Sequence, residues 1–267
     1  AFSLPASDPA AGLRRGGVDA GALFTTAGGV HGERAAFTVL RSEGDYRRVA
    51  EDALAGALDV LGTPREALAA VAGTGLGAAK ISLGSELSEI TCLATGIARL
   101  FPDAAQVIDV GGHGTRVIRL GPGGAVKDFA VTGQCAAGSA RILEVIAHLL
   151  GLDLAELGEV SLRSKSPAEF VVGCAVFAET EAISFLTRGT SREDLLAGLH
   201  QSLAARILAM ARAGGAPGPW AVTGGGAKDA GLVARLRAAA QSIVVPPEPM
   251  VVAALGAALL AGDTRAG

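Results

Sequence analysis

The 267-residue sequence predicts an α/β protein made of two similar halves. Two stretches lead to this prediction, because each reads as an apolar strand that carries an aspartate and ends in a glycine turn, at residues 19–21 and at residues 109–112. Strand and helix patterns alternate after both turns. We expect a poorly ordered segment over residues 1–16, a first half over 17–131, and a second half over 132–267 whose last helix closes the fold.

Composition excludes several classes of protein. Half of the residues are hydrophobic but only 4% are aromatic, so the core must consist mainly of Ala, Val, Leu and Ile. A net charge of −3 gives no electrostatic reason to expect nucleic acid, and the sequence shows neither a membrane-spanning apolar stretch nor the layout of a secretory signal. Three cysteines, an odd number, favour metal or redox chemistry in a reducing compartment over disulfides. We therefore expect a cytoplasmic protein without nucleic-acid or membrane partners.

Periodicity and end signals place the elements of the first half. In chain order they are a strand over 34–40, a helix over 45–62, a capping-box start at 63–66, a strand over 68–72 and a helix over 88–101. The glycine run at 73–77 imitates a dinucleotide fingerprint, but its spacing and its place in the chain disfavour a dehydrogenase. Cys92 lies in mid-helix among apolar neighbours, so we interpret it as a small buried hydrophobic residue.

The second half begins in the same way and continues with helices. The expected strands lie over 107–120, around a glycine turn, over 125–131 and from 219. The expected helices lie over 139–150, 174–188, 190–212 and 251–260 and from 229, and residues 152–165 should carry a short acidic helix followed by a polar loop. Ser139 is the expected N-cap of the first of these helices. We expect His200 to be partly exposed and give it no role. Gly256, among alanines, should pack tightly against a neighbour.

Two cysteines stand just ahead of predicted helices. Cys135 precedes the helix that begins at Ser139, and Cys174 opens the helix that ends before Gly189. Unpaired amides and the positive end of the helix dipole favour a thiolate at such a position. Two thiolates cannot complete a tetrahedral metal site, whereas a four-iron cluster needs four cysteine ligands. Two copies of this arrangement across a dimer axis would supply them.

The motifs around these cysteines resemble a known family. Cys-Ala-Ala-Gly-Ser from Cys135, followed by Ile-Leu-Glu, and Cys-Ala-Val-Phe-Ala-Glu-Thr-Glu from Cys174 are similar to the paired cluster motifs of BadF/BadG/BcrA/BcrD-type ATPases. These are the ATPase subunits of benzoyl-CoA reductase and the activators of 2-hydroxyacyl-CoA dehydratases. The resemblance covers residues 85–262 well and residues 17–84 loosely. It implies an actin/Hsp70/sugar-kinase-like fold of two RNase H-like halves with an interdomain nucleotide cleft, and one [4Fe-4S] cluster shared by two protomers.

The first glycine turn corresponds to a phosphate- and Mg²⁺-facing turn of this family. The family pattern is Gly-Ile-Asp-x-Gly-Ser followed by a lysine, and Asp19 and Gly21 match it. Ala22 replaces the hydroxyl, and Thr26 stands where the lysine would be. On the residues alone, a glycine turn beside an aspartate is also typical of an ordinary hairpin, so the phosphate interpretation depends on the resemblance.

The second glycine turn departs further from its family pattern, Asp-Ile-Gly-Gly-Gln-Asp-x-Lys. Asp109, Gly111 and Gly112 match, but His113 and Gly114 replace the amide and the carboxylate that orient Mg²⁺ and water. The lysine is replaced as well, by Arg116, which can still offer positive charge to a phosphate. These changes put efficient hydrolysis in doubt. His113 is either a surface histidine or a catalytic one.

A third glycine turn follows the strand that begins at residue 219. Gly224, Gly225 and Gly226 lead into a helix, an arrangement that suits an anion or a flat ring close to the backbone. In the superfamily this place holds the adenosine and the α-phosphate, while an ordinary βα turn is the alternative. Gly138, ahead of the helix after Cys135, is assigned to the cofactor site with them.

The resemblance implies an ATP-coupled, low-potential electron-transfer subunit. Its cofactors would be the [4Fe-4S] cluster, ATP or ADP, and Mg²⁺, and its partners a second ATPase protomer, catalytic reductase or dehydratase subunits, and a ferredoxin-type electron donor. We favour the benzoyl-CoA reductase type, because an altered ATPase chain is easier to tolerate beside a competent partner subunit. The alternatives are a homodimeric dehydratase activator and a nucleotide-binding scaffold that does not hydrolyse ATP. A small-molecule kinase is disfavoured because the turn at 111–116 offers no base aspartate.

Overall fold

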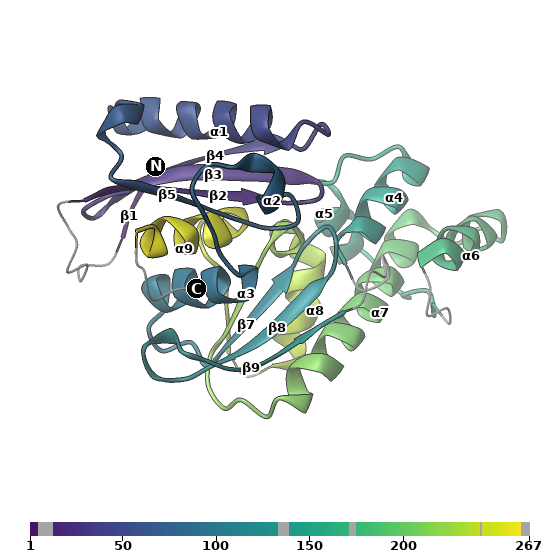
Figure 1. The fold of residues 1–267 in the computed structure, drawn as a ribbon. Coiled ribbons are helices and arrows are strands. Elements are labelled where there is room, and N and C mark those ends of the chain that lie inside the picture. The colour runs from purple at the N-terminus through teal and green to yellow at the C-terminus, as the bar shows by residue number, and fades with distance from the viewer. Residues whose placement is uncertain (5–12, 133–138, 171–174, 241, 263–267) are drawn as a thin grey trace. The chain divides into compact units, whose positions relative to one another are not determined.

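The structure is a computed structural model that describes residues 1–4, 13–132, 139–170, 175–240 and 242–262 (Figure 1). The chain forms two compact units. The first comprises Ala1–Ala104, Leu120–Lys127 and Pro246–Gly267. The second comprises Ala105–Arg119 and Asp128–Val245. The first unit is therefore assembled from three separate stretches of sequence.

The first unit is built on a sheet with the strand order β1-β4-β3-β2-β5-β6. Its strands are β1 (Phe2–Ser3), β2 (Arg14–Ala20), β3 (Phe24–His31), β4 (Arg34–Arg41), β5 (Ala70–Thr74) and β6 (Ser85–Glu86). Strands β2, β3 and β4 form an antiparallel meander, and β5 runs parallel to β2. The long helix α1 (Tyr46–Leu61) covers one face of this sheet, and α9 (Val252–Leu260) covers the other (Figure 1).

Local signals set the ends of these helices. The side chain of Asp45 accepts a hydrogen bond from the backbone of Arg48 at the start of α1, and Gly62 ends that helix in the left-handed conformation with φ of 63°. Helix α3 (Glu89–Leu100) lies against α9. The short elements of this unit are η1 (Arg65–Ala67), α2 (Ala78–Ile81), η2 (Pro122–Gly124) and η5 (Pro249–Val251).

Glycines allow α9 to lie against its neighbours at backbone contact distance. A Cβ on Gly256 would overlap the carbonyl of Cys92 in α3, and one on Gly17 in β2 would overlap the carbonyl of Ala254. A side chain on Gly96 in α3 would overlap the carbonyl of Val252 in the same way. The expectation of tight packing at Gly256 is thereby confirmed.

The second unit contains a sheet with the strand order β11-β10-β7-β8-β9. Its strands are β7 (Gln106–Val110), β8 (Thr115–Leu120), β9 (Val126–Val131), β10 (Trp220–Thr223) and β11 (Ile243–Val244). Strand β10 lies between β7 and β11 and runs parallel to both, and β8 pairs antiparallel with β7. Ile108, Val110 and Val222 turn toward the helices of this unit and belong to its core.

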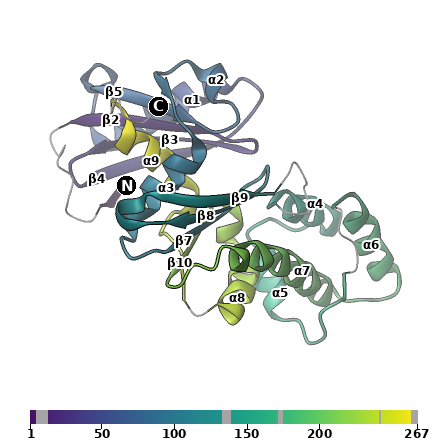
Figure 2. The same cartoon turned by 60° about the horizontal axis from the view of Figure 1, so that its bottom comes forward.

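Among the described residues of the second unit, five helices and a short 3-10 turn accompany the sheet. They are α4 (Arg141–Leu150), α5 (Leu157–Leu162), α6 (Ala175–Thr187), α7 (Arg192–Ala213), η4 (Gly225–Lys228) and α8 (Ala230–Ala239). Helix α7 packs against both α5 and α8 (Figure 2). The side chain of Ser191 caps α7 by accepting from the backbone N–H of Asp194.

Three expectations about organisation differ from the structure. Residues 1–16 are not wholly irregular, since Phe2–Ser3 pairs with β4 and β2 already begins at Arg14. The compact units do not divide near residue 131, because β7 and most of β8 belong to the second unit and residues 246–267 return to the first. The capping box at 63–66 yields only the short turn η1, because Pro64 takes the N-cap position and has no side-chain acceptor. Among the described helices, none is both long and apolar enough to cross a membrane.

The contact between α9 and α3 can be tested at Gly256. The substitution Gly256→Ala should lower the free energy of unfolding by about 1–3 kcal/mol, because the added methyl forces the two helix backbones apart. Gly56→Ala in α1 is the matched control: its Cβ meets only the side chain of Thr38, at 3.2 Å, so the variant should be as stable as the original or more so. Urea unfolding of both variants measures the difference, and an unaltered stability of Gly256→Ala would contradict the packing argument.

Candidate functional site

Asp19 lies in β2, next to the carboxyl end of that strand. Thr26 of β3 is its partner on the antiparallel side, and Thr74 of β5 is its partner on the parallel side. Both threonines are buried, and their hydroxyls donate to the carbonyls of Met250 and Leu87 respectively. The threonine that replaces the family's lysine is therefore part of the sheet packing around Asp19.

Asp109 occupies the corresponding place in the second unit. Arg116 of β8 is its antiparallel partner, and Thr223 of β10 is its parallel partner. Each aspartate thus lies in the first strand of a hairpin, beside a parallel strand that ends in threonine. Ligands of α/β proteins bind outside the carboxyl ends of such parallel strands.

A glycine with positive φ follows each of the two threonines. Gly75 has φ of 87° and Gly224 has φ of 81°, a conformation that residues with a side chain rarely adopt. A Cβ on Gly75 would overlap Oδ1 of Asp19, and a Cβ on Gly224 would lie 2.7 Å from Oδ1 of Asp109. In both units the chain therefore turns closely over the carboxylate, and only glycine leaves room for it.

A buried ion pair distinguishes the second unit. Nη1 of Arg116 lies 3.0 Å from Oδ2 of Asp109, and the two side chains are only 16% and 8% exposed. Burial raises the pKa of Asp109, and the charge and hydrogen bond of Arg116 oppose that rise. Gly111 leaves space for the pair, since its Cβ would lie 3.1 Å from Nη1. The predicted residues Asp109, Gly111 and Arg116 are thus brought together.

The triple-glycine turn offers an accessible backbone next to this pair. A Cβ on Gly225 would meet no atom within 4 Å, whereas one on Gly226 would lie 2.5 Å from a methyl group of Val110. One face of the turn therefore packs against β7, and the other is open to a flat ring or a phosphate. This geometry fits a nucleotide, which must approach the backbone closely. Helix α8 follows η4, with Asp229 as its N-cap.

The other predicted positions lie in the turns beside these carboxylates. The carbonyl of Gly21, after β2, accepts from the hydroxyl of Ser42 at 2.8 Å. Gly112 belongs to the turn between β7 and β8, which is closed by a hydrogen bond from Gly111 N–H to the carbonyl of Gly114 at 3.0 Å. His113 is half-buried in the same turn.

The predicted cluster ligands Cys135 and Cys174, and Gly138 with them, lie outside the described residues. Helices α4 and α6 follow these cysteines in the chain, as predicted. The expected N-cap differs: Ala140 takes that position, and the hydroxyl of Ser139 accepts from the backbone of Arg141 at 3.3 Å.

Cys92 is confirmed as a buried residue of the core. Its side chain is 0% exposed, and burial raises the pKa of its thiol to about 12, against a weaker opposing effect of the hydrogen bond with Thr74. A thiol in this state is a poor metal ligand, because ligation requires the thiolate.

The expectation for His200 is wrong. The side chain is 0% exposed, and its two ring nitrogens contact Ser161 and Asp229. Helix α7 lies against both α5 and α8, so a face that periodicity assigns to solvent is covered.

The sequence pattern also contains a repeat that the prediction did not use. The Thr-Gly pair at 74–75 is the counterpart of the Thr-Gly pair at 223–224, and each pair stands at the end of a parallel strand.

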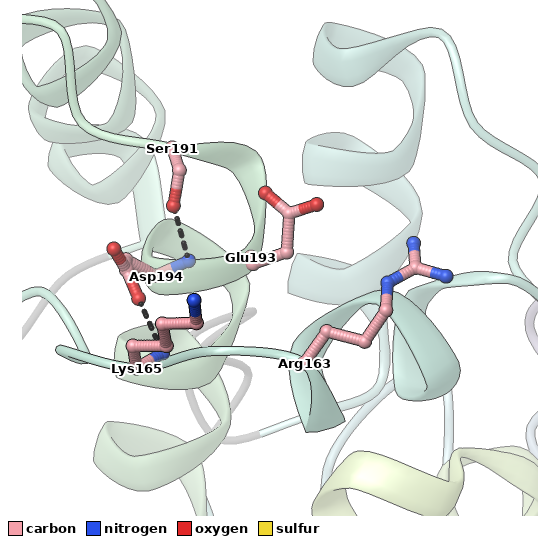
Figure 3. A pocket seen from close by; sticks show the side chains of 5 residues that line it. All are labelled: Arg163, Lys165, Ser191, Glu193 and Asp194. Atoms are coloured by element: carbon pink, nitrogen blue, oxygen red, sulfur yellow. Dashed lines mark hydrogen bonds between the residues drawn. The ribbon is translucent and has the colours of Figure 1, made fainter.

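A polar pocket of about 250 Å³ lies at the start of α7 (Figure 3). Its lining residues are Arg163, Lys165, Ser191, Glu193 and Asp194. Oδ1 of Asp194 accepts hydrogen bonds from the hydroxyl of Ser164 at 2.7 Å and from the backbone of Lys165 and of Ser166 at 3.0 and 2.9 Å. These bonds, the one from Ser164 first, lower the pKa of Asp194 to about 2. The carboxylate therefore fastens the segment after α5 to α7.

The fold and the paired carboxylate turns define an ATPase-like protein of the actin, Hsp70 and sugar-kinase class. The activator of 2-hydroxyisocaproyl-CoA dehydratase from Clostridium difficile, solved with bound ADPNP, superposes with a TM-score of 0.88 and 31% identity over 93% of this chain and 94% of that one. A ROK family glucokinase from Streptomyces griseus shares the fold alone, with a TM-score of 0.55 and 16% identity over 93% of this chain and 99% of that one.

The family follows from the sequence match. Residues 17–261 match the BadF/BadG/BcrA/BcrD ATPase family, and the chain belongs to that family. The activator of lactoyl-CoA dehydratase from Anaerotignum propionicum is 39% identical over 78% of this chain and 82% of its own length. One of the subunits of benzoyl-CoA reductase from Thauera aromatica is 34% identical over 91% of this chain and 90% of its own length.

The ion pair of Asp109 and Arg116 predicts a pH-dependent loss of stability in Arg116→Met. Without the guanidinium the buried carboxylate is uncompensated, so the free energy of unfolding near pH 7 should fall by about 3 kcal/mol. A carboxyl whose folded pKa lies above its unfolded value binds its proton more tightly in the folded state, so stability falls as the pH rises through that range. The loss should therefore shrink near pH 4. Urea unfolding at both pH values, with Asp109→Asn/Arg116→Met as the compensated control, measures this, and a loss independent of pH would contradict it.

The carboxylate of Asp194 predicts the opposite pH dependence. Its folded pKa of about 2 lies below the ordinary value of 3.8, so its contribution is present above pH 3.8 and is lost as the pH falls toward 2. Asp194→Asn should therefore lower the unfolding midpoint in urea near neutral pH, and its difference from the original protein should narrow below pH 4. Glu193→Gln, a neighbour in the same pocket, is the matched control and should show little effect. If the difference in unfolding midpoint between Asp194→Asn and the original protein stayed constant from pH 7 to pH 3, the stabilising role of the Asp194 carboxylate would be refuted.

Proposed function

We propose that this chain is an ATP-driven electron-transfer component of a CoA-ester dehydratase or reductase system. The observation that carries the proposal is the repeated arrangement of a carboxylate beneath a glycine turn, at Asp19 with Gly75 and at Asp109 with Gly224. It occurs in a chain of this ATPase family that also has the two cysteine motifs. Relatives named as dehydratase activators and as a component of a reductase support the class of partner.

The triple-glycine turn would hold one part of the bound nucleotide. The open backbone at Gly225 supports the placement of the adenosine and the α-phosphate at the triple-glycine turn. Asp19 and Asp109 supply carboxylate oxygens of the kind that Mg²⁺ prefers, directly or through water. In hydrolysis, water attacks the γ-phosphorus, the bond to the bridging oxygen breaks, and ADP leaves. The chain's part in this step is to position the phosphates and to offset their charge.

Cys135 and Cys174 would hold a [4Fe-4S] cluster together with the same two residues of a second protomer. Such a cluster, when bound, supplies a one-electron carrier whose potential depends on charge, hydrogen bonds and exposure around it. In the sequence each cysteine precedes a helix, α4 or α6, and the thiolate is favoured where a cysteine lies at a helix N-terminus. A ferredoxin-type protein is the proposed donor of the electron.

The type of system depends on the second protomer. The reductase type joins two unlike ATPase subunits, whereas the activator type is a homodimer. The altered turn at 113–116 favours the reductase type, while the 39% identity to the lactoyl-CoA dehydratase activator favours the activator type. The molecular mass of the anaerobically purified chain separates them, because a dimer that forms without a second gene product supports the activator.

A scaffold that binds nucleotide without hydrolysing it is the second candidate. The observation in its favour is that Nη1 of Arg116 bonds to Asp109, in a turn that lacks the family's amide and carboxylate at 113 and 114. ATP turnover by the purified chain, alone and with the partner subunits, tests it. Turnover by the chain alone would exclude the scaffold.

The cluster assignment makes a direct prediction about iron. Anaerobically purified protein should contain about four iron atoms per dimer and show an EPR signal on reduction, and Cys135→Ala or Cys174→Ala should abolish both. Cys92→Ala is the matched control and should retain the iron, because Cys92 is buried and its pKa is raised. Iron that survives the loss of Cys135 would rule the cluster role out.

A further inference from the structure

A buried chain of hydrogen bonds joins three helices of the second unit and has no part in the chemistry proposed above. Nδ1 of His200 in α7 lies 2.8 Å from the hydroxyl of Ser161 in α5. Nε2 of His200 lies 3.0 Å from Oδ2 of Asp229, the N-cap of α8. Ser161 is 2% exposed and His200 is 0% exposed. The three residue types are those of a hydrolytic triad, but their burial keeps any substrate from Ser161.

Hydrogen-bonding chemistry fixes the direction of the bond to Asp229. An ionised carboxylate only accepts, so Nε2 donates to Oδ2 in either charge state of the imidazole. The second carboxylate oxygen, Oδ1, accepts from the backbone N–H of Leu232 at 2.9 Å and so caps α8. Polar groups this deeply buried are costly to leave without partners, which makes the position of the carboxylate depend on His200.

The same aspartate is bonded to the triple-glycine turn. The backbone N–H of Asp229 donates to the carbonyl of Gly226 at 3.2 Å, and the N–H of Ala227 donates to the carbonyl of Gly224 at 3.1 Å. A displacement of Asp229 would therefore displace the triple-glycine turn directly, through the hydrogen bond to Gly226. The open face of Gly225 lies between these two anchored glycines.

Glycines on two helices allow α5, α7 and α8 to approach closely around the hydrogen-bonded residues. A Cβ on Gly231 in α8 would lie 2.6 Å from Nδ1 of His200. A Cβ on Gly158 in α5 would lie 2.8 Å from the backbone N of Gly231 and 3.0 Å from Oδ1 of Asp229. Helices α5, α7 and α8 pack against one another around these contacts (Figure 2). The imidazole consequently has little room to move relative to the carboxylate that it orients.

We infer that His200 is a positioning residue for nucleotide binding. It holds the carboxylate of Asp229, and through the bond to Gly226 it fixes the backbone at Gly225, without touching the nucleotide itself. The inference rests on the proposed function, since it takes the triple-glycine turn as the nucleotide site. It adds a residue from the middle of α7, remote in the sequence from every glycine turn.

Two conservative substitutions separate positioning from packing. The amide of Gln carries its nitrogen as far from Cβ as Nε2 is, so His200→Gln keeps the donor to Asp229 and gives up Ser161. The amide of Asn reaches only as far as Nδ1, so His200→Asn keeps Ser161 and gives up Asp229. Each variant leaves one buried polar group without its partner, so the two variants should show a similar decrease in the midpoint of thermal unfolding. Titration of the anaerobically purified protein with a fluorescent ADP analogue measures the nucleotide Kd.

His200→Asn should raise the Kd about tenfold, in line with the loss of one hydrogen bond to a charged group, while His200→Gln should stay within about threefold of the original. The exposed His148→Ala in α4 is the control for loss of a histidine. Should His200→Asn not fold, Asp229→Ser replaces it, because serine still caps α8 but is too short to reach Nε2. Equal effects of Asn and Gln on the Kd, or none from either, would overturn the positioning role. Original protein that binds no nucleotide would instead remove the proposed function, and this role with it.

Discussion

The structure depends most on one constraint, which is that a carboxylate is enclosed at the carboxyl end of a pair of parallel strands. A glycine with positive φ must follow the second strand of each pair, because a side chain at Gly75 or Gly224 would run into the aspartate. The hairpin strand on the other side supplies the remaining neighbour, Thr26 or Arg116. The two strands of each hairpin, the parallel strand and the glycine turn thus form one structural repeat, which occurs twice in the chain.

Much of the fold was predictable because local signals determine it. The cap residues Asp45 and Gly62 mark the ends of α1 where the sequence places them, and the apolar periodicity of α4 predicts its buried face. The two aspartate–glycine turns were likewise readable, since strand, carboxylate and glycine are adjacent in the chain. These features involve residues within a few positions of one another, which is the range over which sequence patterns carry physical information.

What failed depends on contacts between distant parts of the chain. The sequence of α9 contains no local signal, apart from its glycine and alanines, that the helix packs on the first sheet. The need for a small residue at 256 becomes clear only in the structure, where Gly256 lies against the backbone of Cys92. The burial of His200 arises because α5 and α8 cover a face of α7 that a two-sided helix would leave to solvent. Burial by a third or fourth element cannot be deduced from the period of a single helix. The counterpart of the triple-glycine turn at Gly75 was missed because its glycine spacing suggested a dinucleotide fingerprint.

The two carboxylates are not electrostatically equivalent, and this difference bears on the proposed nucleotide site. Asp109 faces a guanidinium at 3.0 Å, whereas the cross-strand partner of Asp19 is the uncharged Thr26. A divalent cation bound beside Asp109 is repelled by Arg116, and in a buried setting such repulsion outweighs screening by solvent. The cross-strand partner of Asp19 is uncharged, so the proposal that a carboxylate takes part in binding Mg²⁺ is stronger for Asp19 than for Asp109. Relative to the family pattern, threonine at residue 26 removes a positive charge from the first turn, whereas arginine at residue 116 keeps the positive charge of the second.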